Sequence, residues 1–260
     1  LLFELFDKLV APIVLYNSEV WGTSFIPLSN STDILDTKLL SRHMVENLHL
    51  MFIKIILGVS SRTTNWAVTS ESGRYPLAIR SYEAMVKFWQ HLRDSRSIIL
   101  TSALATNAQL HSAGHKTWYS HLERMMRYFS LEYIKCIADR RELMGQIGKT
   151  KVVVQEHFNS KWTDDLHGMH IGGRLELFST LVEEFGVSDY IGIIKNSKHR
   201  IAMTRMRVSA HKLPIETGRY YKISRSSREC PFGCKTLGDE VHYMTSCNHP
   251  FIKEIIDPVM

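Results

Sequence analysis

Residues 39–56 read LLSRHMVENLHLMFIKII, and apolar side chains recur in this stretch at spacings of three and four. Such spacing places them on one face of an α-helix, which repeats about every 3.6 residues. Gly58 follows at a position where a left-handed residue commonly ends a helix. The stretch therefore predicts a helix over 39–56 whose broad apolar face packs into a hydrophobic core.

Further helical patterns follow this stretch. Pro76 suits the first turn of a helix, so a second helix is expected to start there. Its apolar side is formed by Met85, Val86, Trp89 and Leu92. Two more helices are expected within residues 118–143 and 175–185, the latter bracketed by glycines.

Strand signals are few. Residues 151–154 are short and β-branched, and residues 220–224 form a second candidate for an extended piece. Residues 95–116 are rich in Ser, Thr, Ala and Asn, so they are either a linker or a weakly patterned helix, and a domain boundary is expected near them. We therefore predict a mainly α fold.

The composition is that of a folded protein. With 260 residues, of which 44% are hydrophobic and 22% charged, the chain is long enough to bury a core. It begins at Leu1 with apolar residues in a folded pattern, so we expect a fragment of a longer protein.

No apolar run reaches the roughly 18 residues of a membrane span, and the first residues lack a secretory signal. We expect an intracellular protein, nuclear or cytoplasmic or both, without a membrane partner.

Positive charge is concentrated in one part of the chain. Residues 195–228, which we call the basic segment, carry ten lysines and arginines against one acid, Glu216, a local net charge of +9. Because the whole chain carries +6, the remainder carries −3. Such a concentration is typical of a surface that binds a polyanion.

Three of the four cysteines lie close together and close to a histidine. Cys230, Cys234, His242 and Cys247 form the pattern Cys-x3-Cys-x7-His-x4-Cys. Zinc prefers four tetrahedral thiolate or imidazole ligands, and a first pair two to four residues apart lets a tight turn present both sulfurs to one ion. Pro231 and Gly233 can supply that turn, and Gly238 permits the chain to reverse. With four protein ligands the predicted site is structural rather than catalytic.

Other interpretations of these residues remain open. His249 is a competing imidazole, although it lies beyond Cys247 and next to Pro250. The three cysteines can also be unrelated free thiols near a histidine. Cys136, the fourth, is expected to be a small buried residue of a helix.

Several segments outside the cysteine pattern carry a further similarity. They are LFDKLVAPIVLY at 5–16 with EVWG at 19–22, FIKIILGV at 52–59, RTTNWAV at 62–68, GRYPL at 73–77 and DEVHYM at 239–244. Together they resemble the region that follows the polymerase domain in non-LTR (LINE-type) retrotransposon reverse transcriptases. Two positions depart from that pattern: Asn17 stands where the family has glycine, and the first cysteine pair is one residue wider than the commonest spacing.

The resemblance implies a helical thumb and linker bundle followed by a small zinc knuckle. The implied boundaries are a thumb-like region at 1–95, a helical linker with a basic C-terminal part at 96–225, and the knuckle at 226–252. In the family the thumb grips the template-primer duplex, so the implied partners are RNA or DNA and an upstream polymerase domain.

The catalytic motif of the family is missing from this sequence. The polymerase of the family holds two magnesium ions with an aromatic-x-Asp-Asp turn and a further aspartate. Asp164 and Asp165 are the only adjacent aspartates here, and they lack flanking apolar strands, so we expect them at a solvated helix start. We therefore expect a fragment that binds nucleic acid and is not itself an enzyme.

The residues expected to contact nucleic acid are the cations of the basic segment, one histidine and two aromatic residues of the knuckle. They are Lys195, Lys198, Arg200, Arg205, Arg207, His211, Lys212, Arg219, Lys222, Arg225, Arg228, Phe232 and Tyr243. Arg200, Arg207 and His211 recur at seven and four residues, which predicts a row on one helical face.

Two alternatives accompany this prediction. Phe232 and Tyr243 either stack on a base or cover the small core of the knuckle. The chain can also be a zinc-stabilised protein-interaction module in which the basic segment is only a solvated helix face. Binding that weakens steeply with salt would separate the two functions, because only phosphate contacts release counterions.

Overall fold

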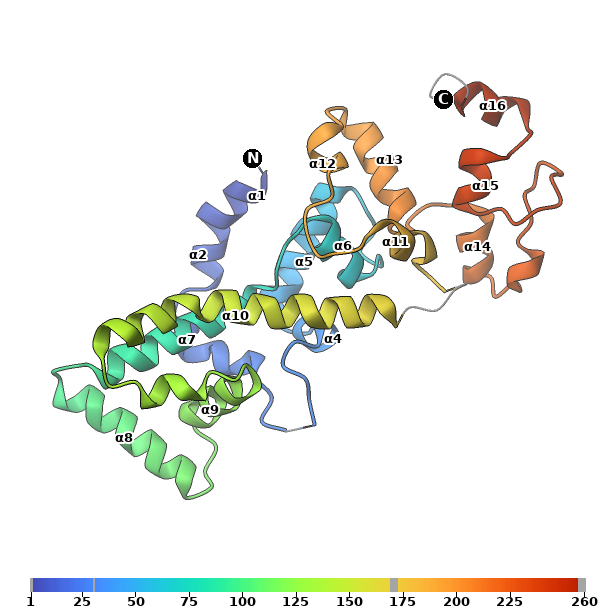
Figure 1. Ribbon diagram of the computed structural model, residues 1–260. Helices are drawn as coiled ribbons and strands as arrows, with labels where there is room; N and C mark the ends of the chain where they lie inside the picture. Colours follow the sequence, from blue (N-terminus) through green and yellow to red (C-terminus); the bar gives the residue numbers. More distant parts are fainter. Residues whose placement is uncertain (1, 30, 169–172, 257–260) are drawn as a thin grey trace. The chain divides into compact units, whose positions relative to one another are not determined.

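The computed structural model describes residues 2–29, 31–168 and 173–256, and it is mainly α, as the sequence predicts (Figure 1). In that part of the chain the extended pairings are two isolated β-bridges, Ser72 with Val187 and Glu229 with Leu237. None of its helices combines the length and the apolar character needed to cross a membrane. The chain divides into two compact units, and both boundaries expected from the sequence lie inside a unit.

Unit 1 comprises residues 1–53 and 74–162. Its elements are α1 (Leu2–Leu5), a π-helical turn (Phe6–Val10), α2 (Ala11–Val14), α3 (Ser18–Trp21), a 3-10 turn (Gly22–Phe25), α4 (Thr37–Leu40), α5 (Met44–Leu57), α7 (Leu77–Arg93), α8 (Ile98–Ser112), α9 (Trp118–Tyr128), a second 3-10 turn (Glu132–Cys136) and α10 (Arg140–His167). The ends of α5 and α10 belong to the second unit.

Helix α7 is central to unit 1, where it packs against α3, α8 and α9. It begins directly after Pro76, as predicted. The predicted apolar side, Met85, Val86, Trp89 and Leu92, is buried. Burying each such side chain contributes about 1.5–3 kcal/mol, so this face anchors the unit.

The stretch 39–56 forms two helices instead of one. The carboxylate of Asp36 accepts a hydrogen bond from the Lys38 N–H at 2.8 Å and caps α4, and α5 starts only at Met44. Gly58 has φ +65°, so the predicted left-handed end is confirmed. The predicted apolar face is wrong in part, because Met44 and Ile55 are exposed.

Two polar residues, Glu46 and His49, lie on the buried face of α5. The Glu46 carboxylate accepts a hydrogen bond from the Leu77 N–H at 2.8 Å and lies 3.3 Å from the ring of His49. It thereby satisfies a backbone donor in the first turn of α7, which has no partner within its own helix. A pattern of apolar residues does not reveal that Glu46 and His49 belong to the buried face, because both side chains are polar.

Neither predicted strand is present. Residues 151–154 lie inside α10, where the surrounding helix overrides their β-branched preference. Tyr220 ends α14, and Lys222 follows with a left-handed φ of +58°. Residues 95–116 contain α8, so the weakly patterned helix is the correct alternative there.

The helix expected within 118–143 is interrupted. Ser130 takes φ +55° after α9, and Cys136 lies in the following 3-10 turn. Cys136 is therefore exposed and not buried as predicted. Asp164 and Asp165 are exposed, as expected, but they lie near the end of α10 and not at a helix start.

Unit 2 comprises residues 54–73 and 163–260. Its remaining elements are α6 (Asn65–Glu71), α11 (Glu176–Leu181), α12 (Tyr190–Ile193), α13 (Ser197–Arg207), α14 (Pro214–Tyr220), a 3-10 turn (Arg225–Ser227), α15 (Glu240–Thr245) and α16 (Pro250–Ile256). The helix expected at 175–185 is the shorter α11. Trp66 of α6 packs edge-on against Phe178 of α11, with ring centroids 5.5 Å apart.

Gly22 has no room for a side chain. A Cβ atom there would lie 1.9 Å from Ser81 Oγ and 3.2 Å from Ser81 Cβ. We expect Gly22→Ala to lower the free energy of unfolding by about 1–3 kcal/mol, as overpacking typically does. Urea denaturation measures the change. Gly145→Ala is the control, because nothing lies within 4 Å of a Cβ built there.

Adding Ser81→Ala to the Gly22→Ala variant removes the nearer of the two clashing atoms. Part of the lost stability should return in this double variant. An equal loss in the Gly22→Ala and Gly145→Ala variants would contradict the packing argument.

Candidate metal centre and basic surface

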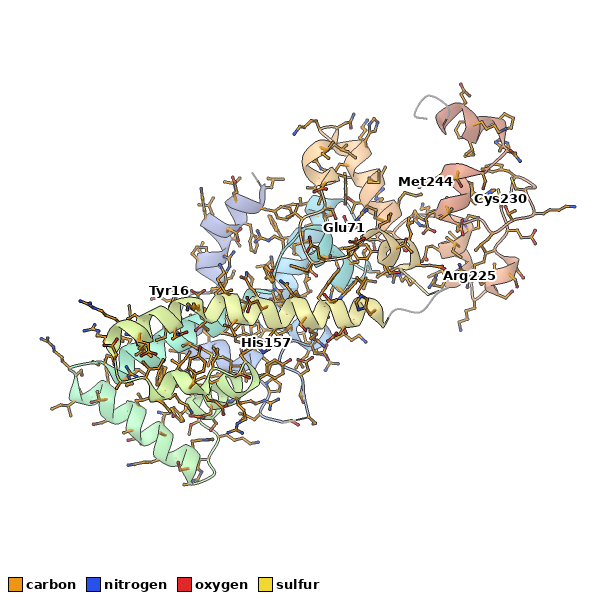
Figure 2. All side chains as sticks on the ribbon, viewed as in Figure 1. Tyr16, Glu71, His157, Arg225, Cys230 and Met244 are labelled. Carbon is orange, nitrogen blue, oxygen red and sulfur yellow. The ribbon has the colours of Figure 1, made fainter. Side chains whose placement is uncertain are left out.

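A tight turn presents two of the four predicted metal ligands. The β-bridge between Glu229 and Leu237 closes a hairpin, and the Cys230 N–H donates to the Thr236 carbonyl at 2.9 Å. Gly233 takes φ +80°, a conformation that favours glycine, so the turn predicted there is confirmed. Cys230 lies on this hairpin, ahead of α15 (Figure 2).

Helix α15 and the residues directly after it supply the other two ligands. The Asp239 carboxylate caps the helix by accepting a hydrogen bond from the His242 N–H at 2.8 Å. Cys247 follows the helix, and its N–H donates to the His242 carbonyl at 2.9 Å. Gly238, between the two halves, lies so close to Pro214 that a Cβ there would be 2.8 Å from its Cγ.

The four predicted metal ligands lie close together in the structure. The ligand atoms of Cys230, Cys234, His242 and Cys247, which we call the Cys-His cluster, lie within 4.8 Å of one another and can hold a metal ion. The sulfurs of Cys234 and Cys247 are 3.9 Å apart. Two thiolates bound to one tetrahedral ion at about 2.3 Å are separated by about 3.8 Å, so the spacing fits such an ion.

The ring of His242 is oriented for coordination. Its Nδ1 lies 3.2 Å from Thr236 Oγ1 and 3.1 Å from Ser246 Oγ. Its Nε2 is buried and has no hydrogen-bond partner within the described residues. Ligating histidines are commonly held by a hydrogen bond at the other ring nitrogen. Because a buried nitrogen without a partner is unfavourable, coordination through Nε2 accounts for this arrangement.

The surroundings of Cys230 favour its thiolate. Burial opposes ionisation, but hydrogen bonds from the Phe232 N–H and the Tyr243 hydroxyl outweigh it and lower the pKa of Cys230 to about 6. Burial raises the pKa of the Cys247 thiol. Since the thiolate is the form that binds metals, Cys230 is ready to coordinate at neutral pH.

The aromatic residues near the cluster have different roles. The Tyr243 hydroxyl is hydrogen-bonded to Cys230, and its ring centroid lies 5.3 Å from that of His242, so this side chain lies over the cluster. Phe232 is exposed and stacks on His249, with ring centroids 4.0 Å apart. His249, the competing imidazole, is not among the four clustered ligands. Phe232 is the aromatic residue that remains a candidate for base stacking.

Many cations of the basic segment are bonded to the protein itself. Ion pairs join Arg207 to Glu71 at 2.7 Å, Arg219 to Glu216 at 3.2 Å and Arg225 to Glu176 at 2.7 Å. The His211 ring is hydrogen-bonded to the Glu240 carboxylate, with Nε2 and Oε1 2.6 Å apart. Backbone carbonyls accept from Lys195 (Gly192), Arg200 (Ile194), Arg205 (Gly58) and Arg228 (Ile215 and Ile223). Lys198, Lys212 and Lys222 are exposed.

The predicted row of Arg200, Arg207 and His211 is wrong. Helix α13 ends at Arg207, and Ser209 takes φ +54°, so His211 has left the helix. The ring of His211 is buried against Glu240. These side chains stabilise unit 2 instead of presenting one continuous face.

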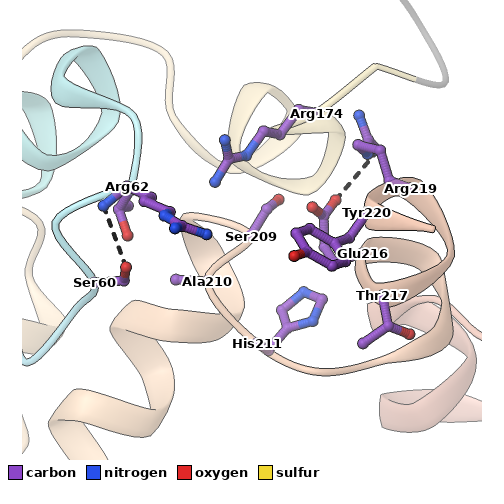
Figure 3. Close-up of a pocket in the computed structure, with 11 residues that line it drawn as sticks. Ser60, Arg62, Arg174, Ser209, Ala210, His211, Glu216, Thr217, Arg219 and Tyr220 are labelled. Carbon is purple, nitrogen blue, oxygen red and sulfur yellow. Dashed lines mark hydrogen bonds and ion pairs between the residues drawn. The ribbon is translucent and has the colours of Figure 1, made fainter. Parts of the chain in front are cut away.

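The acidic partners had no signal in the sequence, because Glu71 precedes Arg207 by 136 residues and Glu240 follows His211 by 29. Sequence reasoning also missed Arg62 and Arg174, which lie outside the basic segment but share a cleft with Arg219 (Figure 3).

No family model, curated protein or solved structure matches this chain.

Proposed function

We propose that this chain is a nucleic-acid-binding segment of a LINE-type reverse transcriptase, stabilised by one structural zinc ion. The Cys-His cluster carries the proposal, because four ligand atoms of the types that zinc prefers lie within 4.8 Å. All four positions are supplied by protein, so the ion would stabilise the hairpin and α15 and take no part in catalysis. No enzymatic activity is proposed for the chain.

Exposed charge supports the nucleic-acid role. The ammonium groups of Lys198, Lys212 and Lys222 make no hydrogen bond or ion pair with another described residue. Ammonium groups free in this way attract phosphates and release their counterions. Phe232 adds an exposed aromatic ring beside the cluster.

The turn before Trp21 supports the family assignment. Asn17 takes φ +55° and ψ +25°, a left-handed conformation that glycine adopts freely and asparagine tolerates. The glycine of the family would therefore fit the same turn. The Trp21 indole N–H donates to the Tyr16 carbonyl at 2.7 Å and closes it.

We expect the chain to bind single-stranded RNA or DNA with an affinity that falls steeply with salt. Three lysines that meet phosphates contribute a slope of about −2 to the logarithm of affinity against the logarithm of salt. Fluorescence anisotropy with a labelled twelve-nucleotide strand measures this slope. Replacing Lys198, Lys212 and Lys222 with alanine should flatten it by about 2.

The matched control removes three exposed cations of α10 in unit 1, Arg141, Lys149 and Lys151. This variant should keep the slope of the unmodified chain. Equal flattening by both triple variants would mean that the basic segment has no special role.

The second candidate is a zinc-stabilised protein-interaction module. Val241 and Met244 of α15 and Phe251 of α16 are exposed apolar side chains, and they favour it. A protein interface does not release phosphate counterions. Failure to bind either kind of strand, with zinc present, would therefore support this candidate.

A further inference from the structure

Unit 2 contains a cleft of about 350 Å³ formed by residues far apart in the sequence. Arg62 and Thr63 come from the loop after α5, Arg174 precedes α11, Ser209 follows α13, and Arg219 and Tyr220 belong to α14 (Figure 3). A volume of a few hundred Å³ is typical of a small-molecule site.

Two guanidinium groups face this space without an acidic partner. Arg62 and Arg174 point into the cleft, and neither guanidinium forms a hydrogen bond or ion pair within the described part of the chain (Figure 3). The acid among the lining residues, Glu216, is already paired with Arg219. The cleft therefore presents uncompensated positive charge, which favours an anion.

Buried donors at the cleft also lack partners. Thr63 is 3% exposed, and its Oγ1 has no hydrogen-bond partner among the described residues. The Nε of Arg219 is likewise buried and unpartnered, although its Nη2 donates to the Gly173 carbonyl at 3.2 Å. Because an unsatisfied buried donor is unfavourable, a ligand rich in acceptor oxygens would stabilise both groups.

The positive charge at the cleft also affects a neighbouring lysine, Lys54. Lys54 donates a hydrogen bond to the Ser61 carbonyl at 2.7 Å. Burial lowers the pKa of Lys54, and the charge of Arg174 lowers it further. An anion bound at Arg174 would reduce this repulsion.

An aromatic ring stands at the same cleft. Tyr220 is 73% exposed and lies beside the space into which the guanidinium groups point (Figure 3). Nucleobases stack on exposed aromatic rings, and guanidinium groups bind phosphate oxygens in pairs. The two features together match a nucleotide unit better than an isolated anion.

We propose that this cleft binds the phosphate group of a nucleotide unit through Arg62, Arg174 and Thr63, with the base stacked on Tyr220. The proposal rests on the proposed function in placing that nucleotide within a single strand of RNA or DNA. A free nucleotide offers the same chemistry, so the experiment separates the two sources.

The test titrates the full zinc-loaded chain with a twelve-nucleotide single strand, with adenosine monophosphate and with inorganic phosphate. Arg62→Ala with Arg174→Ala should weaken binding of the strand about 10- to 100-fold and flatten its salt slope by about 0.7, the share of the one phosphate that both arginines contact. Tyr220→Ala should weaken binding of the strand about tenfold without changing the slope. Arg96→Ala with Arg141→Ala is the control, because it removes two exposed arginines of unit 1.

The outcomes separate the cleft from the wider basic surface. If binding of the strand needs the exposed lysines but not Arg62 and Arg174, the proposed role of the cleft is wrong. The proposed function of the chain would remain. Adenosine monophosphate that binds as tightly as the strand, and loses affinity in the cleft variant, would support the cleft with a free nucleotide as its ligand. A cleft variant that binds all three probes like the control would overturn the proposal. Thermal unfolding of each variant verifies that it is folded.

Discussion

Cys230→Ser and Cys247→Ser are each expected to lose the bound zinc ion and to unfold the hairpin and α15 around it. Structural zinc stabilises small metal-dependent domains by about 10–16 kcal/mol, so loss of one ligand removes more stability than most core substitutions. Metal analysis by mass spectrometry should find one zinc per unmodified chain and none per variant. Hydrogen exchange should accelerate at 229–247, while α7 of unit 1 stays protected.

Cys136→Ser is the matched control, because it removes an exposed thiol of unit 1 that is not part of the Cys-His cluster. His249→Ala tests the competing imidazole, and it should also keep one zinc per chain. Full zinc occupancy in Cys230→Ser would contradict the four-ligand assignment. Loss of zinc in His249→Ala alone would move the nitrogen ligand from His242 to His249.

The Cys-His cluster was predictable because its residues are close in sequence. The Cys-x3-Cys pair and the His-x4-Cys pair restrict the geometry so strongly that spacing alone predicted the cluster. The start of α7 was predictable for a similar reason, since Pro76 and the face that ends at Leu92 are local features. Residues close in sequence determine both features, so long-range contacts in the folded chain did not alter them.

The features that sequence did not predict depend on distant partners. Glu46 is buried on α5 because it satisfies the N–H of Leu77, 31 residues later. The charge count of the basic segment was correct, but it did not tell which cations Glu71, Glu176 and Glu216 neutralise. Periodicity treats every arginine as solvated, whereas the fold uses several as half-buried hydrogen-bond donors.

Arg207→Met is expected to destabilise unit 2 by about 3–5 kcal/mol, because it leaves the carboxylate of Glu71 buried without its counterion. The side chain of Glu71 is fully buried and that of Arg207 is 14% exposed, and their Nε–Oε1 distance is 2.7 Å. The guanidinium also lies 5.3 Å from the ring centroid of Tyr190. Glu71 lies at the end of α6, beside α13, so the pair joins these helices (Figure 2).

The neighbouring backbone depends on the same pair. The Ser188 N–H donates to the Glu71 carbonyl at 3.1 Å, and the Ser188 hydroxyl lies 3.4 Å from Arg207 Nη2. Burial, followed by the charge of Glu71, raises the pKa of Tyr190. Hydrogen exchange at 65–71 and 197–207 in Arg207→Met should therefore accelerate well beyond that of unit 1.

A double variant distinguishes a buried charge from simple loss of packing. Replacing both members of a buried ion pair with apolar residues of similar volume is often neutral, so Glu71→Leu with Arg207→Met should recover most of the stability that Arg207→Met loses. Lys87→Met breaks a more exposed pair with Glu83 on α7, and it should cost no more than about 0.5 kcal/mol. Urea denaturation of the three variants measures these differences. If Arg207→Met costs no more than Lys87→Met, the Arg207 guanidinium is not a structural element of unit 2, and its assignment as a nucleic-acid contact would stand again.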